Sequence, residues 1–106
     1  MKNRKGSEMD LQTATQHFRL LSDPTRIRLL LLLDKEELSV AELAAITQLA
    51  QPRVSTHLSR LKEAGLVSDR REGVFVHYRL ATNIVDKSLH ELWKLLRSST
   101  SDPLIE

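Results

Sequence analysis

The sequence predicts a mainly α-helical domain with one small β-hairpin (α+β), in the order α-α-α-α-β-β-α. Two observations support this. From Ser39 to Gly65 the chain reads as two short helices joined by a tight turn, the second with a polar, basic outer face. The segment LVSDRREGVFVHYRL follows at once and alternates apolar with polar side chains around a charged tip. Together they form the layout of a winged helix-turn-helix, which indicates sequence-specific DNA binding rather than catalysis.

Length and composition limit the chain to one small domain. Of its 106 residues, we expect 1–8 to be a flexible N-terminus, 9–97 to form the DNA-binding and dimerisation domain, and 98–106 to be a flexible tail. A chain this short buries only about 60–65% of its unfolded surface, so association would stabilise it. Cysteine is absent, which excludes disulfides and thiolate metal sites. No bilayer-spanning stretch or signal peptide is visible, so a cytoplasmic protein is expected.

Positive charge gathers on the segment predicted to meet DNA. The net charge of the whole chain is only +2. Between Gln51 and Leu80, however, six Arg and Lys residues stand against three Asp and Glu residues, a local excess of +3 that leaves −1 for the rest. This distribution favours a nucleic-acid partner over a merely solvated basic face.

Two helices are predicted in the first third of the chain. Asp23 can cap the second of them, and Pro24 suits its first turn. That second helix, over residues 24–34, is apolar nearly all round and is expected to be the central core helix. The first helix shows apolar residues in steps of three and four, as one helix face requires: Leu11, Ala14, Phe18 and Leu21.

The next two helices form the predicted helix-turn-helix. Ser39 with Glu42 three residues later makes a capping box that starts the third helix. A turn over residues 47–50 leads to the fourth helix, which begins at Gln51, and Gly65 suits the left-handed conformation that ends it. The buried stripe of the fourth helix is expected to be Val54, Leu58, Leu61 and Ala64.

The last third predicts a hairpin and a final helix. Glu72 and Gly73 supply the hairpin turn. One hairpin face should carry Val74, Val76, Tyr78 and Leu80, and the other Phe75, His77 and Arg79. The final helix, over residues 84–97, has an apolar band wider than a lone surface helix needs. We therefore expect a homodimer interface on the first and last helices, formed by Leu11, Phe18, Leu89, Leu92, Trp93 and Leu96.

Polar side chains on the fourth helix and the hairpin tip are the candidate DNA contacts. Gln51 can pair with adenine and Arg53 with guanine in the major groove, whereas Arg71 on the tip can reach the adjacent minor groove. His57 can bind a phosphate or form a hydrogen bond within the domain, and the sequence leaves both open. The full set is Gln51, Pro52, Arg53, Ser55, Thr56, His57, Ser59, Arg60, Lys62, Arg70 and Arg71.

The element order resembles the ArsR/SmtB family of bacterial winged-helix repressors over residues 11–96. The segments that carry the resemblance are LLSDPTRIRLLLLL, RVSTHLSRLKEAGLV and RREGVFVHYRL. The resemblance implies a homodimer, joined through its first and last helices, that represses transcription from an operator. A two-fold dimer predicts an inverted-repeat operator, and we expect the protein to block its own promoter. Many members of that family release DNA when a metal or metalloid binds.

The metal sites of that family are incomplete here. Its thiolate-binding members carry two cysteines at the start of the third helix, where Ser39 and Ala41 stand in this chain. A second family site, on the last helix, opens with an Asp-x-His pair, but here Ser88 stands two residues after Asp86, in the place of the histidine. We therefore expect no metal and no cofactor, and the inducer is not identified. A metal sensor with a non-cysteine site at the dimer interface stays open, with ligands from His17, Asp86, His90 or Glu91.

Enzyme readings lack support in the sequence. The chain has only three glycines and no Gly-rich phosphate loop, and no nucleophile is paired with a base. A winged-helix module that binds another protein is the remaining alternative, and binding to an operator would separate the two readings.

Overall fold

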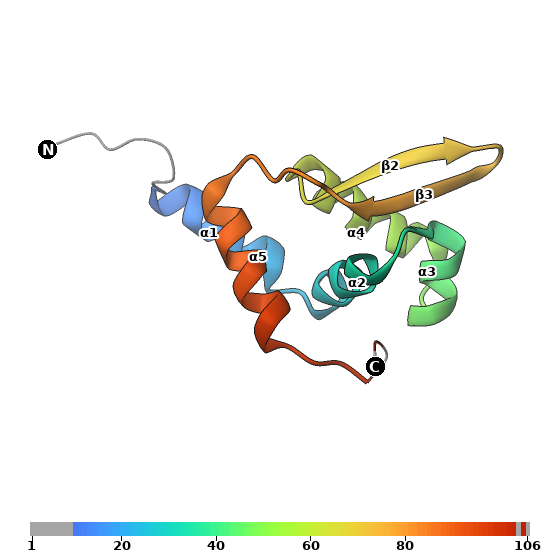
Figure 1. Ribbon diagram of the computed structural model, residues 1–106, viewed down its shortest axis with the longest axis horizontal. Coiled ribbons are helices and arrows are strands. Elements are labelled where there is room, and N and C mark those ends of the chain that lie inside the picture. Colours follow the sequence, from blue (N-terminus) through green and yellow to red (C-terminus); the bar gives the residue numbers. More distant parts are fainter. Residues whose placement is uncertain (1–9, 104, 106) are drawn as a thin grey trace, which may run out of the picture.

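The computed structural model describes residues 10–103 and 105 of the chain. These residues confirm the mainly α-helical class with a β-hairpin wing (Figure 1). The elements are α1 (Leu11–Leu21), α2 (Pro24–Lys35), β1 (Leu38–Ser39), α3 (Val40–Thr47), α4 (Gln51–Glu63), β2 (Val67–Glu72), β3 (Phe75–Leu80) and α5 (Lys87–Ser99). No helix among the described residues has the length and hydrophobicity to cross a membrane.

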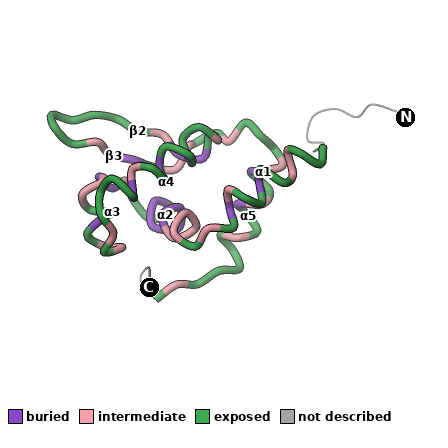
Figure 2. Tube along the Cα trace, turned by 180° about the vertical axis from the view of Figure 1, so that it is seen from behind, coloured by how far each residue is buried: buried purple, intermediate pink, exposed green. Residues whose placement is uncertain are grey.

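Helix α2 is the centre of the hydrophobic core. Asp23 caps it, because its Oδ1 accepts the backbone N–H groups of Thr25 at 2.8 Å and Arg26 at 3.3 Å, and Pro24 occupies the first turn. The leucines at 29–33 are all buried, none more than 7% exposed, as the all-round apolar pattern predicts. Figure 2 shows this buried segment between α1 and α5 on one side and α3 on the other.

The helix-turn-helix follows its local signals. Ser39 and Glu42 form the predicted capping box: each side chain accepts the other's backbone N–H, at 3.0 Å and 2.8 Å. The turn places Gln48 in the left-handed region at φ 60°. Gly65 ends α4 with φ 82°, and the N–H of Leu66 donates to the carbonyl of Leu61 at 3.0 Å, the bond of a Schellman motif.

The wing belongs to a three-stranded antiparallel sheet in the order β1-β3-β2. Strand β1, which the sequence analysis missed, pairs Leu38 with Tyr78 and Ser39 with His77. A two-residue strand shows no alternation, so only its partner reveals it.

The hairpin turn lies one residue later than predicted. Gly73, at φ 64°, and Val74 occupy it, instead of Glu72 and Gly73, because Glu72 pairs with Phe75 across the strands. Val74 is therefore 89% exposed and does not share the inner face of the hairpin, whereas Tyr78 is buried. A two-residue turn that starts with glycine matches the right-handed twist of the strands.

Helix α5 starts later than predicted, and part of its apolar band is used inside the subunit. Asp86 caps it by accepting the N–H of Leu89 at 3.0 Å, so residues 84–86 lie outside the helix. Leu89 is 1% and Trp93 2% exposed within a single chain, so they have almost no surface left for a second subunit to contact. The opposite holds on α1, where Leu11 is 84% and Phe18 58% exposed. The predicted interface is then left to Leu11, Phe18, Leu92 and Leu96.

The predicted tail over residues 98–106 begins inside α5, which ends at Ser99, and two of its residues contact the rest of the subunit. Asp102 places Oδ2 at 2.6 Å from Nε of Arg28, and Ile105 packs against the core. Arg97 Nε also lies 3.4 Å from Asp34 Oδ2 at the end of α2. These contacts depend on chain folding and leave no local sequence pattern. The predicted flexible segment 1–8 lies outside the described residues.

Replacement of Trp93 should destabilise each subunit rather than only its association. Trp93→Ala removes a buried aromatic side chain and should lower the free energy of unfolding by about 3–5 kcal/mol, measured by urea denaturation. Phe18→Ala is the matched variant, because Phe18 is an exposed aromatic on α1. It should leave subunit folding nearly unchanged but weaken association in light scattering at micromolar concentration. Equal effects of the two changes on unfolding would contradict this assignment.

Candidate nucleic-acid interface

Helix α4 divides into a buried face and an exposed polar face. Val54, Leu58 and Leu61 are fully buried against the core, which fixes the direction of the other face. The half-buried members of the predicted contact set on this helix are Ser55 and His57. The exposed members are Gln51, Pro52, Arg53, Thr56, Ser59, Arg60 and Lys62. The structure thus brings most of the predicted contacts on α4 together on one accessible surface.

The leading end of α4 is suited to an anion. The N-cap residue Ala50 offers no side-chain hydrogen bond, and the first turn contains no acidic residue. The N–H groups of Arg53 and Val54 donate to the carbonyl of Ala50, and Pro52 has no N–H. The positive end of the helix dipole is therefore not neutralised by a local carboxylate, which favours a phosphate at this end.

The basic side chains of the interface fall into paired and unpaired groups. Lys62 Nζ lies 3.0 Å from Asp69 Oδ1 at the start of the wing. Arg70 Nε lies 2.6 Å from Glu37 Oε2, next to β1. These two residues tie the wing to the rest of the domain, a role that the sequence analysis did not assign to them. Within the described part of the chain, no ion pair involves Arg53, Arg60 or Arg71.

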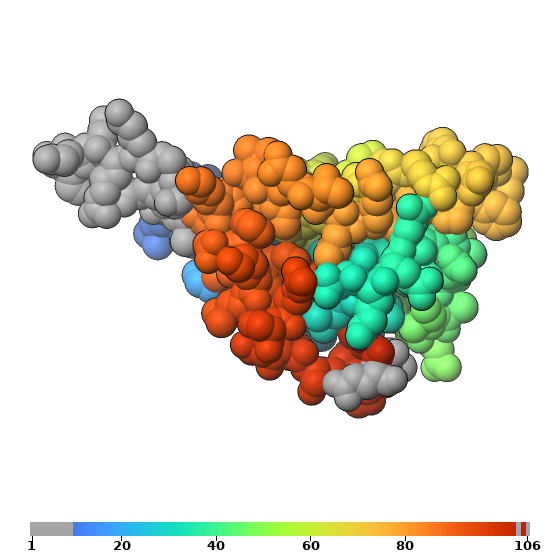
Figure 3. Space-filling view, in the orientation of Figure 1, coloured from blue at the N-terminus to red at the C-terminus, as the bar shows by residue number. Residues whose placement is uncertain are grey.

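The wing projects beyond the body of the molecule. The space-filling view in Figure 3 shows the β2–β3 hairpin reaching past the helical part at one end. Its tip presents Arg71, Val74 and Phe75 to solvent, and Phe75 is 54% exposed. Such a projecting tip with an exposed arginine can reach a groove beside the one that a helix occupies.

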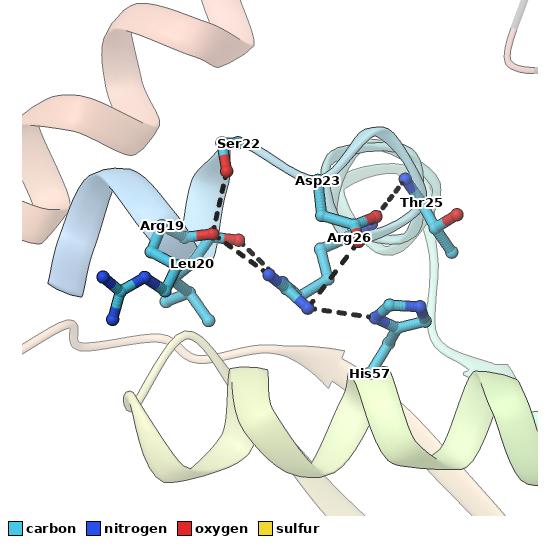
Figure 4. Close-up of polar contacts among 7 residues, drawn as sticks. All are labelled: Arg19, Leu20, Ser22, Asp23, Thr25, Arg26 and His57. Carbon is cyan, nitrogen blue, oxygen red and sulfur yellow. Dashed lines mark hydrogen bonds and ion pairs between the residues drawn. The ribbon is translucent and has the colours of Figure 1, made fainter. Parts of the chain in front are cut away.

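His57 is half-buried and makes a hydrogen bond within the domain. Its Nδ1 lies 3.2 Å from Nη1 of Arg26, an arginine in the first turn of α2 (Figure 4). Because a guanidinium only donates hydrogen bonds, Nδ1 accepts, so the ring must be neutral for this bond. Of the two alternatives left open by the sequence, the intradomain bond is present, and a contact of His57 with a DNA phosphate stays a prediction. Arg26 was missed because 31 positions separate it from His57.

The electrostatic surroundings of His57 also favour the neutral ring. Burial is the largest cause that holds the pKa of His57 below its ordinary value. Asp23 opposes this, whereas Arg26, Arg53 and Arg60 lower the pKa of the ring further.

The four side chains weighed as metal ligands are not gathered into one site within the described subunit. His17 Nε2 lies 3.3 Å from Asp86 Oδ2, which links α1 to the start of α5. His90 and Glu91 are exposed on α5. Among the described residues, no three His, Asp or Glu side chains cluster in a way that could hold a metal ion. Asp86 instead caps α5.

The stability of the protein should fall on acidification through His57. The folded state lowers the pKa of this ring, so the unfolded state binds more protons at acidic pH. The contribution of the neutral His57 ring to the free energy of unfolding is complete above about pH 6.5. It is lost as pH falls from there towards the lowered pKa of the folded state.

Urea denaturation at pH 7.5 and pH 5.5 measures this loss. His57→Gln keeps an acceptor for Arg26 but does not titrate, so the loss of stability between these pH values should be smaller than in the wild type. His90→Gln changes an exposed histidine and should retain the full loss. An unchanged loss in His57→Gln would assign the pH dependence to another group.

Comparison with known proteins gives a consistent result. A sequence profile described as bacterial regulatory protein, arsR family, matches residues 23–69. The chain is 45% identical over 76 residues to the arsenic resistance transcriptional regulator ArsR1 of Pseudomonas putida, with 71% of this chain and 59% of that protein covered. It therefore spans less than two thirds of that relative. It is 41% identical over 83 residues to the arsenical resistance operon repressor of Escherichia coli, with 74% and 71% covered.

A solved structure extends the likeness to the fold. The homodimeric winged helix-turn-helix DNA-binding domain Mb0332 of Mycobacterium bovis matches with a TM-score of 0.65 and 27% identity, covering 89% of this chain and 88% of that one. The relatives are transcriptional regulators and not enzymes, in agreement with the expectation from the sequence. The profile, the identities and the winged fold, with its exposed polar face on α4, lead to one conclusion: the chain belongs to the ArsR family of bacterial regulatory proteins.

Proposed function

We propose that the protein is a homodimeric transcriptional repressor that binds an inverted-repeat operator and blocks its own promoter. The observation that carries the proposal is the accessible face of α4, which exposes Arg53 and Arg60 opposite a fully buried stripe. A helix of this kind fits a B-DNA major groove, which is about 12 Å wide. Because DNA lies in the cytoplasm of a bacterium, the protein acts there.

Each side chain of the interface has a proposed task. Gln51 and Arg53 stand in the first turn of α4, where residues of a recognition helix reach base edges, so they read sequence. The hydroxyls of Ser55, Thr56 and Ser59 follow, to a base or a phosphate. Thr56 is partly engaged, since its Oγ1 donates to the carbonyl of Pro52 at 3.0 Å. Arg60 and the wing arginine Arg71 bind phosphate or the adjacent minor groove.

The dimer is proposed to form through the apolar surface that α1 and α5 leave uncovered. Leu11 and Phe18 on α1 are exposed, Leu95 on α5 is 62% exposed, and Leu92 and Leu96 are half-buried. Exposed apolar side chains on two helices at one end of a small subunit favour a second copy as their cover. The two recognition helices of such a dimer enter successive major grooves about 34–36 Å apart. The association of Phe18→Ala tests this surface.

DNA-binding measurements should separate residues that read bases from residues that bind the backbone. Gln51→Ala and Arg53→Ala should relax base preference, each by about 1–3 kcal/mol if the contact is bidentate. Arg71→Ala should weaken binding to all sequences alike and reduce the dependence of affinity on salt. Fluorescence anisotropy with the operator and a scrambled duplex, at several salt concentrations, measures both.

Ser98→Ala on α5 serves as the surface control, since Ser98 lies outside the proposed DNA contacts. If the wild type binds the operator no better than the scrambled duplex, the repressor function is refuted. In that case a winged-helix module that binds protein becomes the better account. A change of sequence preference in Arg71→Ala, but not in Arg53→Ala, would exchange the two roles.

Metal ions should leave operator affinity unchanged. The third helix begins with Ser39 and Ala41 rather than cysteines, and the Asp86 side chain caps α5. A titration of the DNA complex with Zn(II), Cd(II) and As(III) at stoichiometric concentration tests this. Release by zinc that disappears in His90→Ala would establish metal sensing at a non-cysteine site and overturn the proposal. The inducer is otherwise unassigned.

A further inference from the structure

One guanidinium group connects three elements of this fold. Arg26 Nε donates to the carbonyl of Leu20 at 2.7 Å, and Nη2 donates to the carbonyl of Arg19 at 3.0 Å, both in the last turn of α1. Its Nη1 donates to Nδ1 of His57 on α4 at 3.2 Å and lies 3.9 Å from Oδ2 of Asp23, the cap of α2. Figure 4 shows the side chain between the end of α1 and the middle of α4. Only 12% of this side chain is exposed.

The contacts of the Arg26 guanidinium with α1 and with α4 are geometrically linked. The last carbonyls of a helix lack intrahelical partners, so α1 offers acceptors that a cation satisfies well. The guanidinium is planar, with donors in fixed directions, so its bonds to α1 determine where Nη1 points. Nη1 then determines where the His57 ring lies, and with it the rotation of α4 about its own axis. A lysine, with a single flexible ammonium, could not impose this relation.

We propose that Arg26 is a positioning residue that sets the half-site spacing this protein accepts, by holding α4 in a fixed orientation to α1. The inference rests on the proposed function, in which α1 joins the subunits and α4 reads DNA. One base pair added between half-sites moves one of them by roughly 3.4 Å and rotates it by roughly 35° about the DNA axis. A dimer with a rigid link from α1 to α4 rejects that change, whereas a loosened dimer tolerates it.

The experiment compares operators that differ only in spacing. Selection from random DNA with the wild-type protein defines the preferred inverted repeat, and one base pair is then inserted or removed at its centre. The wild type should favour its own spacing by about tenfold or more, as for a single mismatched base pair. In Arg26→Met, which keeps an apolar stem without donors, the preference should fall below about threefold.

His57 provides an independent pair of variants. His57→Leu removes the acceptor on α4 and should also reduce the spacing preference below about threefold. His57→Gln retains an acceptor and should keep the wild-type preference. If Arg26→Met does not fold, these two variants decide the result.

Arg28→Met is the matched control for loss of an arginine from α2. Arg28 stands two residues after Arg26 but pairs with Asp102 in the C-terminal segment, and its replacement should leave the preference unchanged. The preference is a ratio of two affinities measured on one preparation, so a smaller folded fraction does not alter it.

An equal loss of affinity at every spacing in Arg26→Met and His57→Leu would show that these residues only stabilise the fold, and would refute the inference. Recovery of no inverted repeat by the wild type is a different result, because it refutes the proposed function and this inference with it.

Discussion

Burial of α2 is the constraint on which the other elements depend. A helix with leucine at every position from 29 to 33 has no face that water solvates well, so it must be covered on all sides. Helices α1 and α4 and strand β3 contact it directly. Helix α4 contributes Val54, Leu58 and Leu61 to this core and leaves its opposite side outside. The direction of the DNA-reading face therefore follows from the packing of a helix that does not touch DNA in the proposed function.

Polar contacts fix the relative orientation of the helices and the wing, which apolar packing holds together. Apolar packing tolerates small rotations of one helix against another, whereas hydrogen bonds with fixed directions do not. Arg26 supplies such bonds between α1 and α4, and Arg70 forms an ion pair with Glu37 that links the wing to the segment before α3. In a dimeric repressor, the position of each recognition helix relative to the same helix of the partner subunit depends on both the apolar and the polar contacts.

In this small domain, some basic side chains make contacts within the fold, and others lie on the surface proposed to bind DNA. Some basic residues hold elements of the fold together. Lys62 and Arg28 form ion pairs with carboxylates, and Arg26 donates to a backbone carbonyl of α1. Among the described residues, Arg53, Arg60 and Arg71 have no ion pair and lie on α4 or the wing. The net charge of the chain is only +2, so the electrostatic attraction for DNA depends on this local placement rather than on total charge.

Features that depend on near neighbours in the chain could be predicted from the amino-acid sequence. The Asp23 cap, the Ser39–Glu42 capping box and the Gly65 helix end each involve residues within a few positions, so their signals are local and were read correctly. The periodicity of α4 also separated its buried stripe from the face proposed to meet DNA. The turn of the wing was misplaced by one residue, because strand pairing chose the register.

Contacts between residues far apart in the chain became visible in the folded structure alone. It placed Trp93 inside the subunit, paired β1 with β3, and joined Asp102 to Arg28 across 74 positions. It also brought His57 against Arg26, which gave a candidate DNA contact a hydrogen bond within the domain. Periodicity tells which face of a helix is apolar but not which other segment covers that face. Those choices follow from the packing of all elements around α2, and no local pattern in the chain encodes them.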